Sequence, residues 1–529
     1  MPVESSKNRD YSSLNPRPVS NGAKDSYDQS SLSPSKSLNI SPDVPPAPEV
    51  MILREVLPAV VGEEGLSNVD PDEPPLAVEI TDPESLPITS KKKKRIEKDS
   101  RLLTTDKWLV RNGHFVTYVG VYLFSILVLF RPYELIGALS FLSATAFYFA
   151  LATLIIFLPS QFAVEGNFTM FSTEVKAILA LTALALITIP IAKDPSMAWL
   201  TFNDTFIKAV VIFVVLVNVV RTRRRLMGLI WLSLGIGVYL SCVAVDMYLK
   251  GQFTVESYRV GVDVGGMFGN PNEMALHFVM MTPIAVVLGI ASKRPIMRIV
   301  YFAMAALLVA ANMVTFSRGG FLGLLAVGLV LAWKLGRRRR LTVSIASIAI
   351  GLVVILAAPG NYGLRMLSIF IPALDPVGSS DQRSDLLKRS LLVTARNPWG
   401  IGIGNFPIVG LHNLQSHNAF TQVSSELGIL GLAAYLIFMI SPFRKISAIE
   451  RKQFDRGEPD WFYYLAIGLQ TAIIGYMVSS FFASVAYNWF IYYLIAYAVA
   501  FRRIYSLERG SEGEIEVPTL WEWRPAEAK

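Results

Sequence analysis

Three arginines and one histidine are the residues whose types and positions could carry chemistry in this chain. Arg259 and Arg383 lie in two long segments between apolar runs, and Arg318 lies in a short one, with apolar residues on both sides. A guanidinium forms bidentate hydrogen bonds to phosphate oxygens and keeps its charge, so several converging arginines would suit a pyrophosphate. His417, in Ser416-His417-Asn418-Ala419-Phe420, could take a proton from a hydroxyl group.

Each of these residues also has a plainer interpretation. A single arginine could extend to lipid headgroups or pair with a carboxylate such as Asp263. His417 could be a solvated loop residue, while Ser416 or Asn418 caps the following helix. His412 lies five residues earlier and competes for the role of base. Spacing in the sequence does not choose between the two histidines.

Other polar and glycine residues could support such a site. Glu426 lies one to two turns into the apolar run after His417, and we expect a structural role for it, either orienting that histidine or pairing with an arginine. The segment Gly269-Asn270-Pro271-Asn272-Glu273 predicts a turn followed by a helix that Asn272 caps. The stretch 400–404 has three glycines without the Lys-Ser/Thr ending of a phosphate loop, so it predicts a tight bend.

The elements that must position these residues are membrane helices. Of the 529 residues, 52% are hydrophobic and 17% charged, whereas an average globular chain has about a quarter charged. The apolar residues form runs as long as a membrane-crossing helix. We predict an all-α polytopic membrane protein with about twelve transmembrane helices. The predicted spans are 115–130, 134–158, 175–191, 204–220, 227–245, 273–291, 296–316, 320–335, 341–358, 419–440, 461–483 and 488–503.

Basic residues predict the orientation of these spans. Clusters of Lys and Arg follow the fourth, sixth, eighth, tenth and twelfth spans, as cytoplasmic loops require. The same count places two long outer loops at about 246–272 and, between spans nine and ten, at about 359–418. In the larger loop, Asp381 predicts the start of a short helix and Asn397-Pro398 predicts its end.

Composition also bounds the domains and the cofactors. We interpret residues 1–105 as a disordered cytoplasmic tail, 106–505 as the transmembrane domain and 506–529 as a cytoplasmic C-terminal tail. The single cysteine, Cys242, and four histidines predict neither a disulfide nor a zinc site, and we expect no metal and no cofactor. The net charge of +8 comes from basic clusters between apolar runs, which disfavours a nucleic-acid partner.

Together these segments resemble the O-antigen ligase and polymerase superfamily of bacterial membrane glycosyltransferases, over about residues 110 to 505. No segment is specific by itself; their order, spacing and shared outer location carry the resemblance. The matching segments are Tyr258-Arg259-Val260-Gly261 with Met267-Phe268-Gly269-Asn270-Pro271-Asn272, Thr315-Phe316-Ser317-Arg318-Gly319-Gly320, Arg383 through Asn397-Pro398-Trp399-Gly400-Ile401-Gly402-Ile403-Gly404-Asn405-Phe406, and Ser416-His417-Asn418-Ala419-Phe420 with Glu426-Leu427-Gly428-Ile429-Leu430-Gly431.

The resemblance implies a GT-C-like fold and transfer of a glycan from undecaprenyl diphosphate at the outer face of the bacterial inner membrane, without a metal ion. It implies that Arg259, with Arg318 or Arg383, holds the donor pyrophosphate and that His417 activates the acceptor hydroxyl. The partners would be the lipid-linked donor, a glycan or lipid A core acceptor, the bilayer and other polysaccharide-assembly proteins.

Alternative functions stay open at this stage. A polymerase would add another lipid-linked repeat unit, whereas a ligase would use a lipid A core or another outer acceptor. A secondary transporter also has about twelve spans, but it tends to show two similar halves and ion sites at the middle of the membrane. A scaffold that recruits partners through the tail would leave the outer arginines unexplained.

Overall fold

The computed structural model describes most of the apolar part of the chain. The described residues are 108–130, 142–263, 268–337, 362–369, 379–457 and 459–510, with the single residues 133, 139, 341, 345, 349, 351 and 371. They belong to one compact unit, Ser85–Lys529. The predicted tail 1–105 lies outside the described residues, and of the predicted tail 506–529 only the first five residues are described, at the end of a helix.

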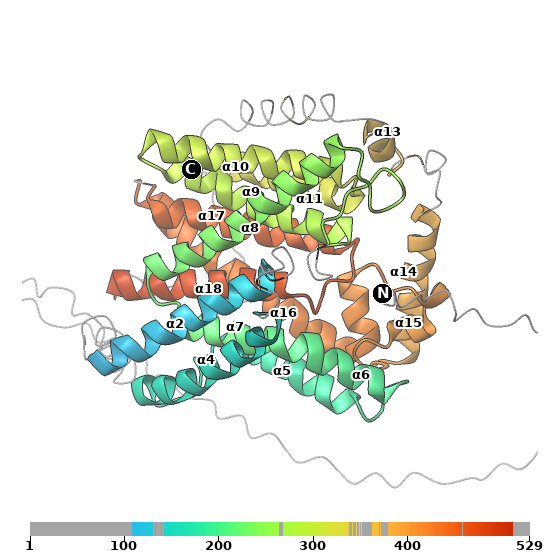
Figure 1. Ribbon diagram of the computed structural model, residues 1–529, viewed down its shortest axis with the longest axis horizontal. Coiled ribbons are helices and arrows are strands. Elements are labelled where there is room, and N and C mark those ends of the chain that lie inside the picture. Colours follow the sequence, from blue (N-terminus) through green and yellow to red (C-terminus); the bar gives the residue numbers. More distant parts are fainter. Residues whose placement is uncertain are drawn as a thin grey trace, which may run out of the picture. The chain divides into compact units, whose positions relative to one another are not determined.

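The described part of the chain is almost entirely helical (Figure 1). Within it, the one β pairing is an isolated antiparallel bridge between Val255 and Arg259. The α-helices are α2 (Trp108–Leu129), α4 (Leu142–Glu165), α5 (Thr173–Thr188), α6 (Pro195–Thr201), α7 (Ile207–Val219), α8 (Arg223–Leu249), α9 (Pro271–Ala291), α10 (Pro295–Val314), α11 (Arg318–Leu335), α13 (Tyr362–Leu367), α14 (Ser379–Arg396), α15 (Phe406–Val409), α16 (Ala419–Asp455), α17 (Trp461–Ser480) and α18 (Trp489–Arg509), with a π-helical turn η3 (Phe202–Phe206) and a 3-10 turn η5 (Leu411–Asn413).

Seven helical segments of the described chain are long and apolar enough to cross a membrane. They are Pro195–Val219, Arg223–Leu249, Pro271–Ala291, Pro295–Val314, Arg318–Leu335, Ala419–Asp455 and Trp461–Ser480. The apolar segments Gly113–Leu129 and Tyr148–Phe162 are shorter. Eleven of the twelve predicted spans overlap helices of the structure, and the ninth, 341–358, lies almost entirely outside the described residues. The count of twelve therefore stays a prediction.

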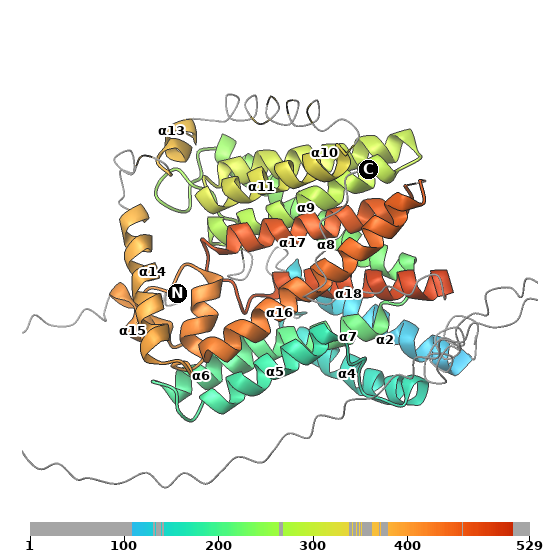
Figure 2. The same ribbon diagram turned by 180° about the vertical axis from the view of Figure 1, so that it is seen from behind.

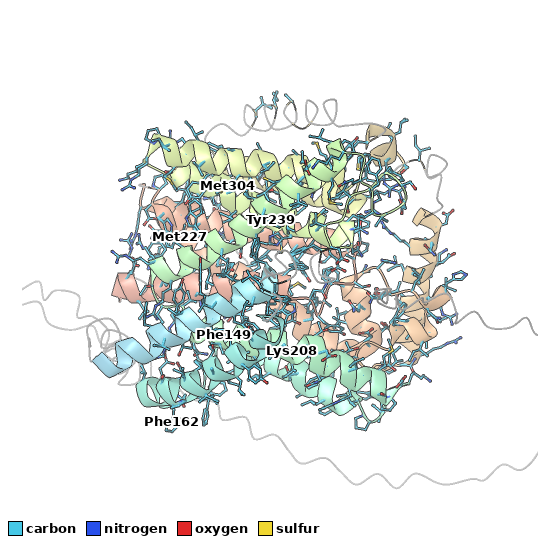
Figure 3. All side chains as sticks on the ribbon, viewed as in Figure 1. Phe149, Phe162, Lys208, Met227, Tyr239 and Met304 are labelled. Carbon is cyan, nitrogen blue, oxygen red and sulfur yellow. The ribbon has the colours of Figure 1, made fainter. Side chains whose placement is uncertain are left out.

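The outward surface of the bundle carries large apolar side chains. Ile187 of α5 and Ile296 of α10 are 66% and 74% exposed. Phe162 of α4 is 54% exposed and points away from the bundle in Figure 3. A water-soluble chain seldom exposes so many side chains of this kind, whereas lipid tails solvate them. The exposed surface therefore agrees with a membrane environment.

The interior of the bundle is built around α9 and α17. These two helices pack against each other, and α9 also packs against α10 and α11. Figure 2 shows α9 and α17 between the α10 and α11 pair on one side and the long α16 on the other. In the apolar windows of α9 and α17, 83% and 78% of the residues are buried, so both helices face protein on nearly all sides.

Two buried glutamates, Glu174 and Glu450, and a largely buried third, Glu165, join helices that are distant in the sequence, a feature that the sequence analysis missed. Glu450 ion-pairs with Lys334 and Arg337, Glu174 with Lys445 and Arg502, and Glu165 with Arg221 and Arg503. Their partners are among the basic residues that predicted the cytoplasmic side. These cations therefore also compensate buried carboxylates, which would otherwise carry a large desolvation cost.

Short helices cover one end of the bundle. In Figure 1, α14 runs across this end, with α13 and α15 beside it. Helix α14 begins at Ser379, so Asp381 lies in its first turn and the predicted start was two residues late. The helix ends at Arg396, directly before the predicted stop at Asn397-Pro398. This end holds the polar side chains to which the sequence analysis assigned chemistry.

Candidate active site

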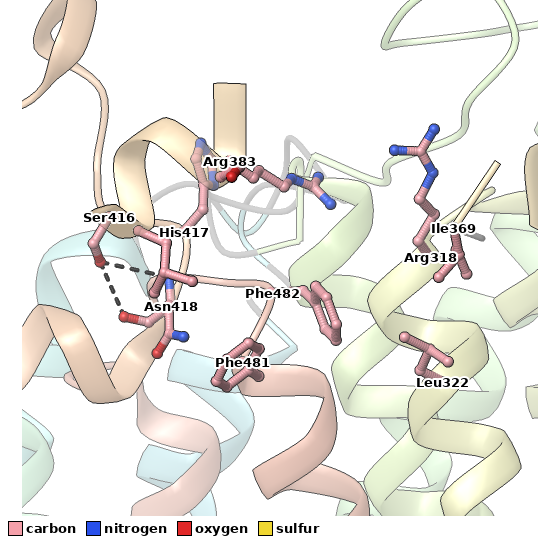
Figure 4. A pocket seen from close by; sticks show the side chains of 11 residues that line it. Arg318, Leu322, Ile369, Arg383, Ser416, His417, Asn418, Phe481 and Phe482 are labelled. Atoms are coloured by element: carbon pink, nitrogen blue, oxygen red, sulfur yellow. Dashed lines mark hydrogen bonds between the residues drawn. The ribbon is translucent and has the colours of Figure 1, made fainter. Parts of the chain in front are cut away.

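A pocket of about 260 Å³ opens beneath α14 (Figure 4). One part of its wall is polar or charged and the other part is apolar. The lining residues are Arg318, Leu322, Ile369, Arg383, Ser384, Leu387, Ser416, His417, Asn418, Phe481 and Phe482. The structure thus brings Arg318, Arg383 and His417 to one cavity, although 99 residues separate the first from the last in the chain.

Arg318 is the first residue of α11, which Ser317 caps by accepting a hydrogen bond from the Gly320 N–H at 3.1 Å. The Arg318 side chain is buried, and its Nη2 donates to Ser368 Oγ at 2.6 Å. The Ser368 hydroxyl in turn donates to the Arg365 carbonyl oxygen at 2.6 Å. A chain of two hydrogen bonds therefore fixes the direction of the Arg318 guanidinium.

Arg365, which the sequence analysis missed, supports the turn before Arg318. Its Nε donates to the Phe316 carbonyl oxygen at 2.9 Å, and Phe316 has φ +50°, which a non-glycine residue rarely adopts. The guanidinium also pairs with Glu256 at 3.2 Å and lies 4.9 Å from the centre of the Tyr258 ring. No sequence signal pointed to Arg365, because it lies 49 residues from the turn that it contacts.

Arg259 does not line the pocket but lies behind the same turn. Its Nε donates to the Thr315 carbonyl oxygen at 2.9 Å and its Nη2 to Asn272 Oδ1 at 2.8 Å. Its nearest described carboxylate is Glu256, at 3.7 Å, and burial lowers its pKa. Among the predicted phosphate-binding arginines, Arg259 thus contacts the backbone next to Arg318, while the other two reach the cavity.

The residue that caps α9 differs from the predicted one. Asn270, not Asn272, caps α9, because its Oδ1 accepts from the Asn272 N–H at 2.9 Å. Pro271 then takes the first helical position, where a backbone N–H would have no partner within the helix, so the N–H that proline lacks is not missed. The Asn272 side chain is left to join two segments, since its Oδ1 accepts from both Arg259 and Ser317 Oγ.

Arg383 reaches the pocket from α14. Figure 4 shows its side chain extending across the space between His417 and Arg318. Burial, followed by the positive charges of Arg259, Arg318 and Arg365, lowers its pKa to about 10, so it remains charged at neutral pH. Four guanidinium groups thus gather at this end, and among the described residues Glu256 ion-pairs with two of them, Arg259 and Arg365. Such a concentration of positive charge favours a polyanionic ligand.

His417 is held by its backbone in a strained conformation. Its φ is +52°, and its N–H donates to Ser484 Oγ at 2.8 Å. Burial, followed by the charge of Arg383, lowers the pKa of its imidazole to about 4. The competing His412 is exposed and does not line the pocket. His412 has nearly the same φ, +53°, so the backbone conformation does not distinguish the two histidines, whereas the pocket wall does, because of the two it includes His417.

The residues on either side of His417 tie it to two helices. Asn418 caps α16, as Oδ1 accepts from the Phe420 and Thr421 N–H groups at 2.9 and 3.1 Å. Ser416 Oγ donates to the Asn418 carbonyl oxygen at 3.0 Å and lies 3.2 Å from Ser484 Oγ. Ser484 lies between α17 and α18, and the sequence analysis did not find its contact with His417, which is 67 residues away.

Glu426 supports the glycine-rich bend and does not contact His417. Its carboxylate accepts from the Gly404 N–H at 2.9 Å and the Phe406 N–H at 3.2 Å. Gly400, Gly402 and Gly404 have φ of +91°, +99° and +72°, so the tight bend predicted for this stretch is present. Glu426 thus has the structural role that we expected. Its partners are backbone N–H groups of the bend, however, and not His417 or an arginine.

The donor set suits an organic anion better than a cation. Two guanidinium groups and an imidazole line the pocket, and none of its described lining residues carries a carboxylate. Among the described residues, no group of three or more His, Cys, Asp or Glu side chains could hold a metal ion. Fixed positive charge next to a neutral imidazole can stabilise a leaving anion and accept a proton from an attacking hydroxyl.

Fold and site together define a polytopic helical membrane protein with a cationic pocket at one end of the bundle. A family model described as O-antigen ligase matches residues 302–436. This match confirms the resemblance to the O-antigen ligase and polymerase superfamily. It includes Arg318, Arg383, His417 and Asn418, but not Arg259. No curated protein matches the chain.

Proposed function

We propose that this protein is a membrane glycosyltransferase that transfers or polymerises an undecaprenyl-diphosphate-linked glycan at the outer face of the bacterial inner membrane. The O-antigen ligase family implies lipid-linked glycan substrates and a membrane environment. The observation that carries the proposal is the meeting of Arg318, Arg383 and His417 in one pocket. Leu322, Ile369 and Phe482 give the same pocket an apolar wall, which suits the lipid next to a diphosphate.

In the proposed reaction, the acceptor hydroxyl oxygen attacks the anomeric carbon of the donor sugar. The bond between that carbon and the phosphate oxygen breaks, and the electron pair leaves with undecaprenyl diphosphate. Arg318 and Arg383 stabilise the charge that develops on the diphosphate. His417, neutral at pH 7, accepts the hydroxyl proton and releases it to water after the product departs.

The arginines and the histidine have separate tasks in this scheme. The diphosphate is a good leaving group once its charge is compensated, so the enzyme needs cations on one side of the anomeric carbon and a base on the other. Arg383 interacts with both His417 and Arg318, because its charge lowers the pKa of His417 and the charge of Arg318 lowers the pKa of Arg383. In the proposed scheme, the guanidinium groups provide all of the positive charge.

The test is a profile of surface and lipid-linked glycans in a strain that lacks the gene, complemented with wild type, His417→Ala or His412→Ala. We expect His417→Ala to behave like the deletion and His412→Ala like wild type, with equal amounts of each protein in the membrane. Single repeat units in the deletion would identify a polymerase. Long chains that stay on the lipid carrier would identify a ligase.

Activity of His417→Ala at the wild-type level would contradict the role of the base. An unchanged glycan profile in the deletion strain, with no second copy of the gene present, would contradict the glycosyltransferase proposal as a whole. The transporter would then be the better interpretation. The two histidine variants form a matched pair, because both residues lie in the same connection with φ near +50° but only His417 lines the pocket.

A further inference from the structure

Asn418 has one half of its side-chain amide occupied and the other half free. Its Oδ1 faces the end of α16, where it accepts from the Phe420 and Thr421 N–H groups. Since both of these groups are donors, the oxygen must lie on that side and the amide nitrogen on the other. The helix cap therefore fixes the direction of Nδ2.

The Asn418 amide nitrogen is buried without a hydrogen-bond partner among the described residues. The residue as a whole is only 3% exposed and belongs to the wall of the pocket. Figure 4 shows it directly below His417, with Phe481 beside it. A buried donor without an acceptor costs free energy, so such a donor in a pocket wall marks a position where an acceptor from a ligand or an ordered water would be stabilising.

The neighbours of Asn418 indicate what kind of acceptor is missing. Arg318 and Arg383 offer donors only, and the described lining residues include no carboxylate. Ser416 Oγ is already engaged with the Asn418 backbone and with Ser484. The polar wall thus presents donors and positive charge, and a group with several acceptor oxygens and negative charge is complementary to it.

We propose that Asn418 Nδ2 donates a hydrogen bond to a phosphate oxygen of the donor diphosphate, next to the oxygens held by Arg383. This inference rests on the proposed function. It gives Asn418 two tasks, because the same amide ends the helix through its oxygen and binds substrate through its nitrogen. The amide would also link the position of the diphosphate to that of His417, the preceding residue.

The two tasks of Asn418 can be separated by substitution. Aspartate and serine cap helices about as well as asparagine, but neither has an amide donor. The experiment uses the full chain in lipid nanodiscs, with inorganic pyrophosphate as the probe in isothermal titration calorimetry. We expect Asn418→Ser to lower the pyrophosphate affinity about tenfold, as loss of a hydrogen bond to a charged group does. Asn418→Asp should lower it further, because a carboxylate repels the anion, and both variants should keep the wild-type melting temperature.

Ser172→Ala is the matched control, because Ser172 caps α5 and does not line the pocket. We expect it to lower the melting temperature and to leave the pyrophosphate affinity unchanged. Wild-type affinity in both Asn418 variants, together with a loss in Arg383→Gln, would overturn the inference and leave the proposed function standing. Wild-type affinity in Arg383→Gln would instead contradict the proposed donor site itself, and with it the inference.

Discussion

At the scale of single residues, the site places a weak base next to a cation. Burial and the charge of Arg383 lower the pKa of His417 to about 4, so the ring is neutral at pH 7. A bound diphosphate would compensate the charge of Arg383 and raise that pKa toward the working pH, where a general base is most effective. The proposed base would therefore be stronger when the donor is bound than when the site is empty.

Substitution of Arg383 should change the titration of His417. In Arg383→Gln we expect the pKa of the imidazole to rise above 4 but to stay below 6.5, because burial, the larger cause, remains. The protonated form would then appear at a higher pH than in wild type. The measurement is an NMR titration of protein labelled with 13C-histidine, in which the chain's four histidines give few signals and His417→Gln assigns one of them.

Arg396→Gln is the control for this titration, because Arg396 is an exposed cation on the same helix and does not line the pocket. It should leave the pKa of His417 unchanged. An identical midpoint in wild type and Arg383→Gln would show that the two side chains do not interact.

The hydroxyl of Ser368 should set the affinity for the donor through Arg318. Ser368→Ala removes the acceptor that directs the Arg318 guanidinium, so we expect KM for the lipid-linked donor to rise about tenfold. Ser368→Thr keeps a hydroxyl group and should restore most of the loss. Steady-state kinetics of both variants check this. A wild-type KM in Ser368→Ala would mean that Arg318 needs no support from α13.

Residue types predicted this site only in part. Arg318, Arg383 and His417 could be chosen because a charged or titratable group near apolar runs is rare and demands a reason, and Asn418 because it precedes an apolar run as a helix cap does. The partners that fix them could not be chosen in the same way. Serine is common, so neither Ser368 nor Ser484 stands out, and each lies at least 50 residues from the side chain or backbone that it contacts.

At the scale of elements, a break in α16 joins the glycine-rich bend to the bundle. Gly428 has φ +75°, and the Ile429 N–H after it donates to the Pro398 carbonyl oxygen at 2.9 Å. On the other side of the contact, the Gly402 N–H donates to the Glu426 carbonyl oxygen at 2.9 Å. The backbone of the bend thus pairs with an N–H and a carbonyl group of α16 that have no partner within the helix because of the break.

Gly428→Ala should strongly destabilise the protein. A Cβ atom at this position would lie 2.3 Å from the Pro398 carbonyl oxygen, in a backbone conformation that disfavours alanine. We expect a loss of at least about 2 kcal/mol in the free energy of unfolding. Gly328→Ala is the control, because a Cβ atom there meets open space within α11 and should be neutral or slightly stabilising. Thermal unfolding of both variants in detergent measures the difference.

The sequence predicted those ends and bends of the helices that depend on residues close by in the chain. The end of α14 at Asn397-Pro398 and the positive φ angles of the glycine stretch follow from residues within a few positions. The break at Gly428 was not predicted, because the apolar run continues through it and its cause is the distant Pro398. The start of α14 and the cap of α9 were each placed two residues too late, as several capping residues stand close together.

At the scale of the whole molecule, the two ends of the bundle differ in chemistry. One end carries the basic loops and the ion pairs of Glu165, Glu174 and Glu450. The other carries α14 (Figure 1) and, by its lining residues, the pocket. The positive charge at the first end suits the cytoplasmic side, so the arginines of the pocket need a separate cause, which the proposed anionic substrate would supply.

This polarity predicts which end faces the cytoplasm. Cys242 is the single cysteine, so Cys242→Ser gives a background in which one new cysteine reports its own side of the membrane. Asp385 on α14 and Lys293 between α9 and α10 are both exposed. In spheroplasts, we expect a membrane-impermeant maleimide to label Asp385→Cys at once and Lys293→Cys only after the membrane is opened. The reverse pattern would place the pocket on the cytoplasmic side. A carrier-linked glycan displayed on the outer leaflet could not reach His417 there, so that result would contradict both the orientation and the proposed function.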